Sequence, residues 1–234
     1  MLGIEELSMI DVLTIRRMAQ SRCLSGVTMQ LVTGGAGFIG SHLVDTLVAE
    51  GKKVRVLDNF SSGREDFLSH HQDSGMVEIF KGDLLDIDAV KSAMQGIKTV
   101  HHLAANPDIR LGTEVTDTDL RQGTLATYNV LEAMRIFDVR RISFSSSSAI
   151  YGEASVMPTP ETYGPVKPIS LYGASKLASE ALITAWCGTF GAKSWIHRFA
   201  NIVGPRGTHG VIYDFIHKLK LDSTRLEVLG NGLQ

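Results

Sequence analysis

The sequence predicts an α/β protein with a Rossmann-type, doubly wound parallel sheet. Three observations lead to this prediction. Strand and helix patterns alternate along the chain, a glycine-rich loop joins the first strand pattern to the first helix pattern, and an acidic residue follows the second strand pattern. These patterns fill residues 29–200. Residues 1–28 carry none of them, so we expect a peripheral N-terminal extension there.

The first unit is a strand, a glycine loop and a helix. The pattern predicts a buried strand at Gln30–Thr33 and a helix at Ser41–Glu50, with the loop between them. Gly34 permits the tight turn, Gly37 lets the backbone approach a pyrophosphate, and Gly40 allows close helix–strand packing. The spacing is GxxGxxG rather than GxGxxG, so a plain turn is the alternative. The context favours a dinucleotide site.

The second strand sharpens the choice of cofactor. Lys53–Leu57 predicts a strand, and Asp58 follows it 18 residues after Gly40 (58 − 40). A carboxylate there can accept hydrogen bonds from both ribose hydroxyls and would repel a 2′-phosphate, which favours NAD over NADP. Arg64 could pair with such a phosphate, or it is an ordinary surface arginine. Three further loop residues could wrap the adenosine: Asn59, Ser62 and Gly63.

Two more strands follow. Met76–Phe80 predicts the third strand, and Asp83 at its end could bond an adenine amino group or cap the next turn. A helix is predicted at Ile87–Gln95. Lys98–Leu103 predicts the fourth strand, and the small pair Ala104-Ala105 at its end leaves room for a cofactor.

Tyr172, Lys176 and Ser147 form a candidate proton-handling set. Residues four apart on a helix share a face, so the Lys176 ammonium can lie beside the phenol. A nearby positive charge lowers the pKa of a tyrosine, and such a tyrosine can take a proton from a hydroxyl and return it. Ser147 ends a serine-rich strand pattern, with Ser145 and Ser146 as alternatives for the catalytic hydroxyl. The Tyr–Lys spacing alone is a weak signal.

Composition excludes several classes of function. The net charge of −2 gives no reason to expect nucleic acid or an anionic membrane as a partner. No apolar run approaches the roughly 20 residues that span a bilayer. Cys23 and Cys187 lack metal or redox spacing, which favours a reduced, cytoplasmic setting. The pairs His70-His71 and His101-His102 lack ligand spacing and partner carboxylates, so we predict no metal site.

Taken together, these motifs resemble those of a known family. They are Gly34 to Gly40, Asp58-Asn59, Gly82 to Leu84, His102 to Ala105, Ser145 to Gly152, Tyr172 to Lys176 and Arg198 to Arg206. The chain resembles the extended short-chain dehydrogenase/reductases, and within them the NAD-dependent sugar-nucleotide epimerase/dehydratase group. It is most similar to the UDP-glucose 4-epimerases, since Ser148 and Ala149 stand where the related dehydratases carry an acidic pair.

The resemblance implies NAD-dependent epimerisation at C4 of a UDP-hexose, UDP-glucose or UDP-galactose, through a 4-keto intermediate. Tyr172 would remove the proton of the sugar 4-hydroxyl, directly or through Ser147, which lies 25 residues earlier (172 − 147). Lys176 would hold the nicotinamide ribose, and Asn201 would contact the phosphate side of the substrate. The expected cofactor contacts are Gly34, Gly37, Phe38, Ile39, Gly40, Asp58, Asn59, Ser62, Gly63, Asp83, Leu84, Leu103, Ala104, Ala105, Gln122 (in place of an Asn), Ser145, Tyr172 and Lys176.

The resemblance also bears on domain organisation. Residues 201–234 match the start of a substrate-binding domain, with a helix at Val211–Leu219 and a strand and turn at Leu226–Gln234. Members of the family continue further, so we expect a partial, C-terminally truncated substrate domain. Two alternatives to the epimerase remain open. One is another NAD-dependent sugar-nucleotide enzyme: a decarboxylase, a reductase or an epimerase of a different sugar. The other is a catalytically incomplete NAD-binding protein.

A homodimer is the partner arrangement that the resemblance implies. It would form through the helices near Leu120–Phe137 and Tyr172–Thr189. The small or apolar residues that could contact the second subunit are Ala126, Leu131, Ala178, Ala181 and Ala185. Packing inside one subunit is the alternative for each of them.

Overall fold

The computed structural model describes residues 28–108 and 111–228. The chain divides into two compact units, of which the first ends at Ala200 and the second begins at Asn201. The predicted N-terminal extension lies outside the described residues, apart from Thr28. Among the residues that are described, no helix has the length and apolar character needed to cross a membrane.

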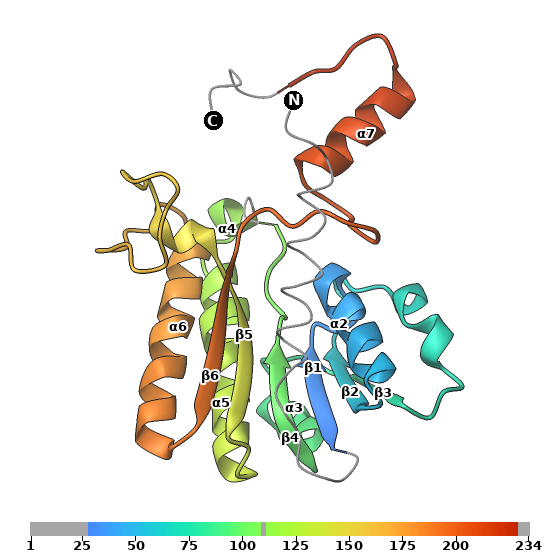
Figure 1. The fold of residues 1–234 in the computed structure, drawn as a ribbon, viewed down its shortest axis with the longest axis vertical. Helices are drawn as coiled ribbons and strands as arrows, with labels where there is room; N and C mark the ends of the chain where they lie inside the picture. Colours follow the sequence, from blue (N-terminus) through green and yellow to red (C-terminus); the bar gives the residue numbers. More distant parts are fainter. Residues whose placement is uncertain (1–27, 109–110, 229–234) are drawn as a thin grey trace. The chain divides into compact units, whose positions relative to one another are not determined.

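The first unit is built on six parallel strands in the order β3-β2-β1-β4-β5-β6 (Figure 1). The strands are β1 (Met29–Thr33), β2 (Lys53–Asp58), β3 (Val77–Lys81), β4 (Ile97–His102), β5 (Arg141–Ser147) and β6 (Lys193–Phe199). The strand order reverses direction between β1 and β4, and ligands of open α/β sheets bind at the carboxyl ends of the strands at such a point. The predicted Rossmann-type sheet is confirmed.

Two apolar clusters hold helices on opposite faces of this sheet. On one face, α3 (Ile87–Met94), α5 (Ala126–Ile136) and α6 (Leu171–Phe190) pack on a core that includes Leu31 of β1. On the other face, α2 (Phe38–Ala49) packs against the next residue, Val32, because successive strand side chains point to opposite faces. The shorter helices are η1 (Glu65–Phe67), η2 (Ser69–His71), α4 (Leu111–Glu114), η3 (Leu120–Leu125) and η4 (Ser148–Tyr151).

Some predicted boundaries shift. Helix α2 starts at Phe38, before the predicted Ser41, because the extended backbone of Gly37 already serves as its N-cap. Asp58 does not follow the second strand but is its last residue, paired in register with Lys81 of β3. The predicted helix from Leu120 onward begins with a π-helical segment, η3, before it becomes α5.

Among residues 201–228 of the second unit there is one helix, α7 (Val211–Leu221), which Gly210 precedes with φ +103. The strand predicted from Leu226 is wrong for residues 226–228, which have no regular structure; the rest of that prediction lies outside the described residues. A strand needs a partner for its backbone groups. Here the carbonyl O of Glu227 accepts instead from Lys218 Nζ at 2.8 Å, within the unit.

The predicted dimer contacts divide into two sets. Ala126 and Leu131 are buried inside the first unit, which agrees with the alternative that they pack inside one subunit. Ala181 and Ala185 of α6 are exposed, and Ala178 is partly exposed.

Candidate active site

The glycine loop lies at the carboxyl end of β1. Gly34 has φ +68, and a Cβ there would lie 2.7 Å from the backbone N of Ala104, just after β4. At Gly40, a Cβ would overlap the carbonyl O of Gly34. Both positions therefore require glycine, and the result is a close contact between the loop, α2 and the end of β4.

The N-terminus of α2 starts in this loop. Gly37 is its N-cap and offers no side chain to accept hydrogen bonds from the first turn, which begins with Phe38 and Ile39. The first N–H groups of a helix lack intrahelical acceptors and carry a partial positive charge, which suits a phosphate. A cradle that a Cβ would fill, next to an uncapped helix N-terminus, fits the pyrophosphate of a dinucleotide such as NAD.

Asp58 braces the glycine loop. Its carboxylate accepts hydrogen bonds from the backbone N of Ala36 at 3.0 Å and from that of Phe60 at 2.9 Å. Gly63 lies against the same carboxylate, because a Cβ there would come within 2.9 Å of Asp58 Oδ1. Each carboxylate oxygen keeps a second acceptor site. The bracing role was not foreseen from the sequence, and the ribose contact stays a prediction.

The polar residues after β2 and β3 contact one another. Asn59 Nδ2 donates to Asp83 Oδ2 at 3.1 Å, and Asp83 Oδ1 accepts from the backbone N of Leu85 at 2.8 Å. Asp83 thus caps the turn, which was one of its two predicted roles. Arg64 forms a bidentate ion pair with the exposed Asp66, in keeping with its interpretation as a surface arginine. Of three other predicted contact residues, Ser62 is exposed, Gly63 is partly exposed and Leu84 is buried.

The end of β4 is tied to β1 through Thr33. Its hydroxyl oxygen accepts from the backbone N of Leu103 at 3.2 Å and from that of Ala104 at 3.3 Å. Ala104 and Ala105 are partly exposed, next to Gly34. The structure therefore brings two predicted cofactor segments, the glycine loop and the end of β4, side by side.

Lys176 is buried and fixed at the base of the candidate catalytic set. Its Nζ donates to the carbonyl O of Ser145 at 2.6 Å and lies 4.9 Å from the centroid of the Phe144 ring. The same Nζ lies 5.7 Å from the centroid of the Tyr172 ring, so both side chains share one face of α6 as predicted. Burial lowers the pKa of Lys176 to about 8, although the negative charge of Asp119 raises it.

The expected lowering of the Tyr172 pKa is wrong for this structure. Burial of the phenol raises its pKa, hydrogen bonding with Ser147 lowers it, and the charge of Asp119 raises it further. The Lys176 ammonium does not reverse this balance, since it donates to the Ser145 carbonyl rather than to the phenol. A phenolate at Tyr172 therefore needs further positive charge nearby.

The three neighbouring serines have different partners. Ser146 Oγ donates to Glu180 Oε1 at 2.5 Å on the buried side of β5, and Glu180 also pairs with Arg198 at 2.9 Å. Ser145 is buried as well, and its Oγ donates to the carbonyl O of His102 at 3.4 Å. Ser147, at the end of the strand, is only partly buried, and its Oγ accepts from the N of Ala149. Of the three hydroxyls, Ser147 is the one placed to meet a ligand.

Asp119 is a site residue that sequence reasoning missed. Its Oδ1 accepts from Asn106 Nδ2 at 3.1 Å, and its buried Oδ2 has no hydrogen-bond partner among the described residues. Its charge acts on both Tyr172 and Lys176, although it precedes Tyr172 by 53 positions (172 − 119). No local motif marks this acid, because only the folded chain brings it to the pair.

The segment after Asp119 is the π-helical η3. π-Helical segments occur often at functional sites. At Gly123 a Cβ would lie 2.7 Å from Ser175 Oγ, so η3 packs closely on α6. Gln122 is exposed on η3. Its contact with the nicotinamide stays a prediction, as does that of Asn201 with substrate, which belongs to the second unit.

The buried lysine has a testable consequence for stability. Between pH 8 and 10.5, folded Lys176 has lost its proton while the unfolded chain still holds one, so rising pH stabilises the folded state. Met cannot titrate. We expect the unfolding free energy of the wild type, relative to Lys176→Met, to rise by about 3 kcal/mol across this range.

Urea unfolding of both proteins at several pH values measures the difference, with the exposed Lys53→Met as the control for general alkaline effects. If the difference in unfolding free energy between the wild type and Lys176→Met does not change above pH 8, burial does not lower the pKa of Lys176.

Comparison with known proteins assigns this sequence to a family. Residues 30–234 match the model of the "NAD dependent epimerase/dehydratase family". The chain belongs to that family. The predicted membership is thereby confirmed, and NAD is the cofactor of the family.

Three members of this family illustrate the similarity. A putative UDP-glucose 4-epimerase of Methanocaldococcus jannaschii is 36% identical over 214 residues, which cover 88% of this chain and 67% of that protein. A crystal structure of a UDP-galactose 4-epimerase superposes with a TM-score of 0.77 at 47% identity, covering 84% of this chain and 64% of that one. The UDP-N-acetylglucosamine 4-epimerase of Methanobrevibacter ruminantium M1, solved with UDP-N-acetylmuramic acid, gives a TM-score of 0.81 at 31% identity, covering 90% and 68%. The chain thus spans about two thirds of the length of these relatives.

Proposed function

We propose that the protein catalyses reversible epimerisation at C4 of a UDP-hexose, with UDP-glucose and UDP-galactose as the pair. One observation carries the proposal. Tyr172 and the buried Lys176 share a face of α6 at the end of β5, where Ser147 presents a partly exposed hydroxyl. This set lies in a chain of an NAD-dependent epimerase family.

The proton steps belong to side chains of this chain. Tyr172, as phenolate, accepts the proton of the sugar 4-hydroxyl, directly or through Ser147, and later returns it to the 4-oxygen. Bound NAD would supply the acceptor and later the donor of the C4 hydride, and a positive ring that favours the phenolate. Lys176, charged below its pKa of about 8, holds the nicotinamide ribose.

Asn201 would bind the phosphate side of the substrate, and Gln122 would contact the nicotinamide region.

Because the chain covers about two thirds of its relatives, the assay is best made on the whole protein with NAD bound. UDP-galactose is supplied, and UDP-glucose is followed by chromatography. Interconversion supports the proposal. A protein that holds NAD but converts neither sugar is not this epimerase.

A second candidate is epimerisation of an N-acetylated UDP-sugar. The observation in its favour is the similarity to the Methanobrevibacter ruminantium enzyme, whose name specifies UDP-N-acetylglucosamine. The proton chemistry at Tyr172 would be the same, so the difference lies in the room around C2 of the sugar. Parallel assays with UDP-galactose and UDP-N-acetylgalactosamine compare the two by their kcat/KM ratio.

Asp58 offers a test of the cofactor preference. We expect Asp58→Ala to weaken NAD binding about 10- to 100-fold, because a charge-assisted hydrogen bond contributes about 1.5–3 kcal/mol. NADP should weaken less, since the lost carboxylate also repels a 2′-phosphate. Titration of both nucleotides measures the ratio of the two affinities.

Asp58→Asn is the matched control, because its single amide oxygen can still accept from Ala36 N in the glycine loop, while only the bond from Phe60 N is lost. If NAD and NADP affinities fall equally in Asp58→Ala, the carboxylate serves the loop and not the ribose.

We also propose a homodimer through α5 and α6. Large apolar side chains are exposed on and beside these helices, among them Leu125, Tyr128, Ile136 and Phe190. Ala181 and Ala185 add small exposed positions on α6. Sedimentation of the wild type and of Ala185→Glu tests the proposal: the charge should dissociate the dimer, and a wild type that sediments as a monomer refutes it.

A further inference from the structure

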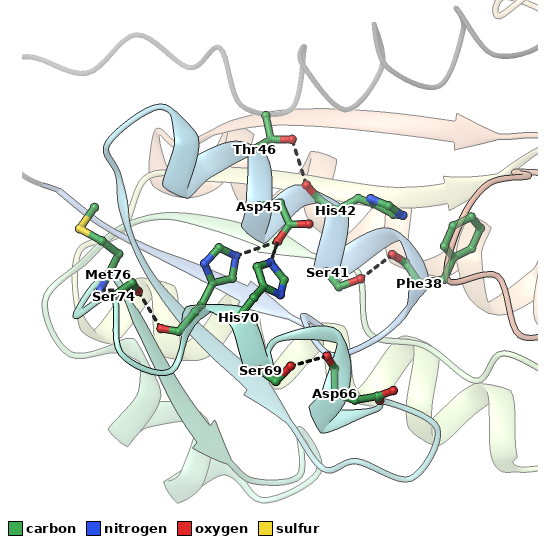
Figure 2. Close-up of polar contacts among 11 residues, drawn as sticks. Phe38, Ser41, His42, Asp45, Thr46, Asp66, Ser69, His70, Ser74 and Met76 are labelled. Carbon is green, nitrogen blue, oxygen red and sulfur yellow. Dashed lines mark hydrogen bonds and ion pairs between the residues drawn. The ribbon is translucent and has the colours of Figure 1, made fainter.

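A second cluster of ligating side chains lies between α2 and η2. Asp45 of α2 faces His70 of η2 (Figure 2), and the adjacent His71 contacts the same carboxylate. Asp45 Oδ1 lies 2.8 Å from His70 Nε2 and 2.7 Å from His71 Nε2. The three donor atoms lie within 4.8 Å of one another. No sequence motif marks Asp45 as a partner carboxylate for this histidine pair, since it precedes His70 by 25 positions.

The convergence of the two rings is unusual for neighbouring residues. On a 3₁₀-helix such as η2, successive side chains point about 120° apart. Here the two ring centroids lie only 4.0 Å apart, and both Nε2 atoms meet one carboxylate oxygen. The side chain of His71 is 10% exposed, so one ligand is already held by packing.

Two imidazole nitrogens and a carboxylate oxygen form a donor set that suits Zn²⁺. In a tetrahedral zinc site with bonds of about 2.0–2.2 Å, neighbouring ligand atoms are about 3.3 Å apart. The present N–O separations are those of hydrogen bonds, so an ion needs them to widen by about half an ångström. Asp45 and the exposed His70 ring can supply that shift by rotation about their side-chain bonds.

We propose that Asp45, His70 and His71 bind one Zn²⁺ ion, with water as the fourth ligand. The ion would link the segment between β2 and β3 to α2, about two helical turns after Phe38. Its role there is structural, because it would fix the segment that follows the loop Asn59–Gly63. The site uses no residue of the proposed catalytic set, so it stands whether or not the protein is an epimerase.

Calorimetric titration with Zn²⁺ alone, near neutral pH after treatment with a chelator, tests the proposal. We expect saturable binding of one ion per chain, and a melting temperature that rises with the ion concentration. Asp45→Asn and His70→Asn keep polar side chains of similar size and should each weaken binding at least about tenfold, a loss in the range seen for changes in metal sites.

His42→Ala is the matched control, since this histidine lies on the same helix, one turn before Asp45, and its ring meets Phe38 instead. It should leave Zn²⁺ affinity unchanged. The control matters because the chain has eight histidines. Equal affinity in wild type, Asp45→Asn and His70→Asn would show scattered surface binding and overturn the proposal, as would a wild type without saturable binding. Circular dichroism confirms that the variants are folded.

Discussion

Tyr172→Phe should lower turnover of the UDP-hexose by about 10²- to 10⁴-fold, the usual contribution of a general acid–base group. Phe keeps the ring that packs beside Lys176 and removes only the phenolic O–H. Without the phenolic oxygen of residue 172, the proton of the sugar 4-hydroxyl would have no acceptor there. Turnover is measured by chromatography of the UDP-sugars, and NAD binding by titration.

NAD affinity should be almost unchanged in Tyr172→Phe, because the glycine loop and Asp58 lie on other elements. Tyr163→Phe is the matched control. Its phenol contacts Ser155 in the segment between η4 and α6, so activity should persist. Activity in Tyr172→Phe comparable to the wild type would refute Tyr172 as the base. A loss of NAD binding would show that the tyrosine is needed for the cofactor rather than for proton transfer.

Gly40→Ala should abolish NAD binding and destabilise the fold by about 1–3 kcal/mol. A Cβ at this position overlaps the carbonyl O of Gly34 and approaches the Cα of Gly35, all of it backbone. Backbone cannot move aside as a flexible side chain can, so the loop must separate from α2. Urea unfolding followed by circular dichroism measures the stability, and nucleotide titration measures the binding.

Gly188→Ala provides the opposite outcome with the same chemical change. Gly188 is exposed on α6, and a Cβ there meets no atom within 4 Å. Ala is favoured over Gly inside a helix by about 0.5–1 kcal/mol, so this variant should be slightly more stable and bind NAD normally. If both variants behave alike, the steric explanation for Gly40 is incorrect.

Local patterns predicted most of the first unit because each depends on neighbouring residues. The strand at β1, the glycine turn and α2 follow one another within about 20 residues, and apolar periodicity marks each element. The errors have local physical causes too. Helix α2 starts early because an extended glycine can cap a helix, and residues 226–228 form no strand because none of the described residues offers them a ladder.

Contacts between distant segments of the chain could not be predicted from the sequence. Asp119 lies far from Tyr172 and Lys176 in the sequence, yet its charge raises the pKa of both. Asp45 of α2 contacts His70 and His71 of η2. Asp58 was predicted as a ribose ligand, yet it also holds the glycine loop through Ala36. None of these pairings has a characteristic spacing, since the intervening elements can differ in length without changing the contact.

The amino-acid sequence was enough to predict the sheet class, the glycine cradle and the spacing that puts Tyr172 and Lys176 on one helical face. Those features depend on backbone geometry and on residues a few positions apart. The electrostatics of the site could be found only from the folded chain. Burial beside Phe144 lowers the pKa of Lys176, and burial with the charge of Asp119 raises that of Tyr172, against the expectation from the spacing alone. The reason is that desolvation and long-range charge depend on everything packed around a group, whereas a motif records only its neighbours in the chain.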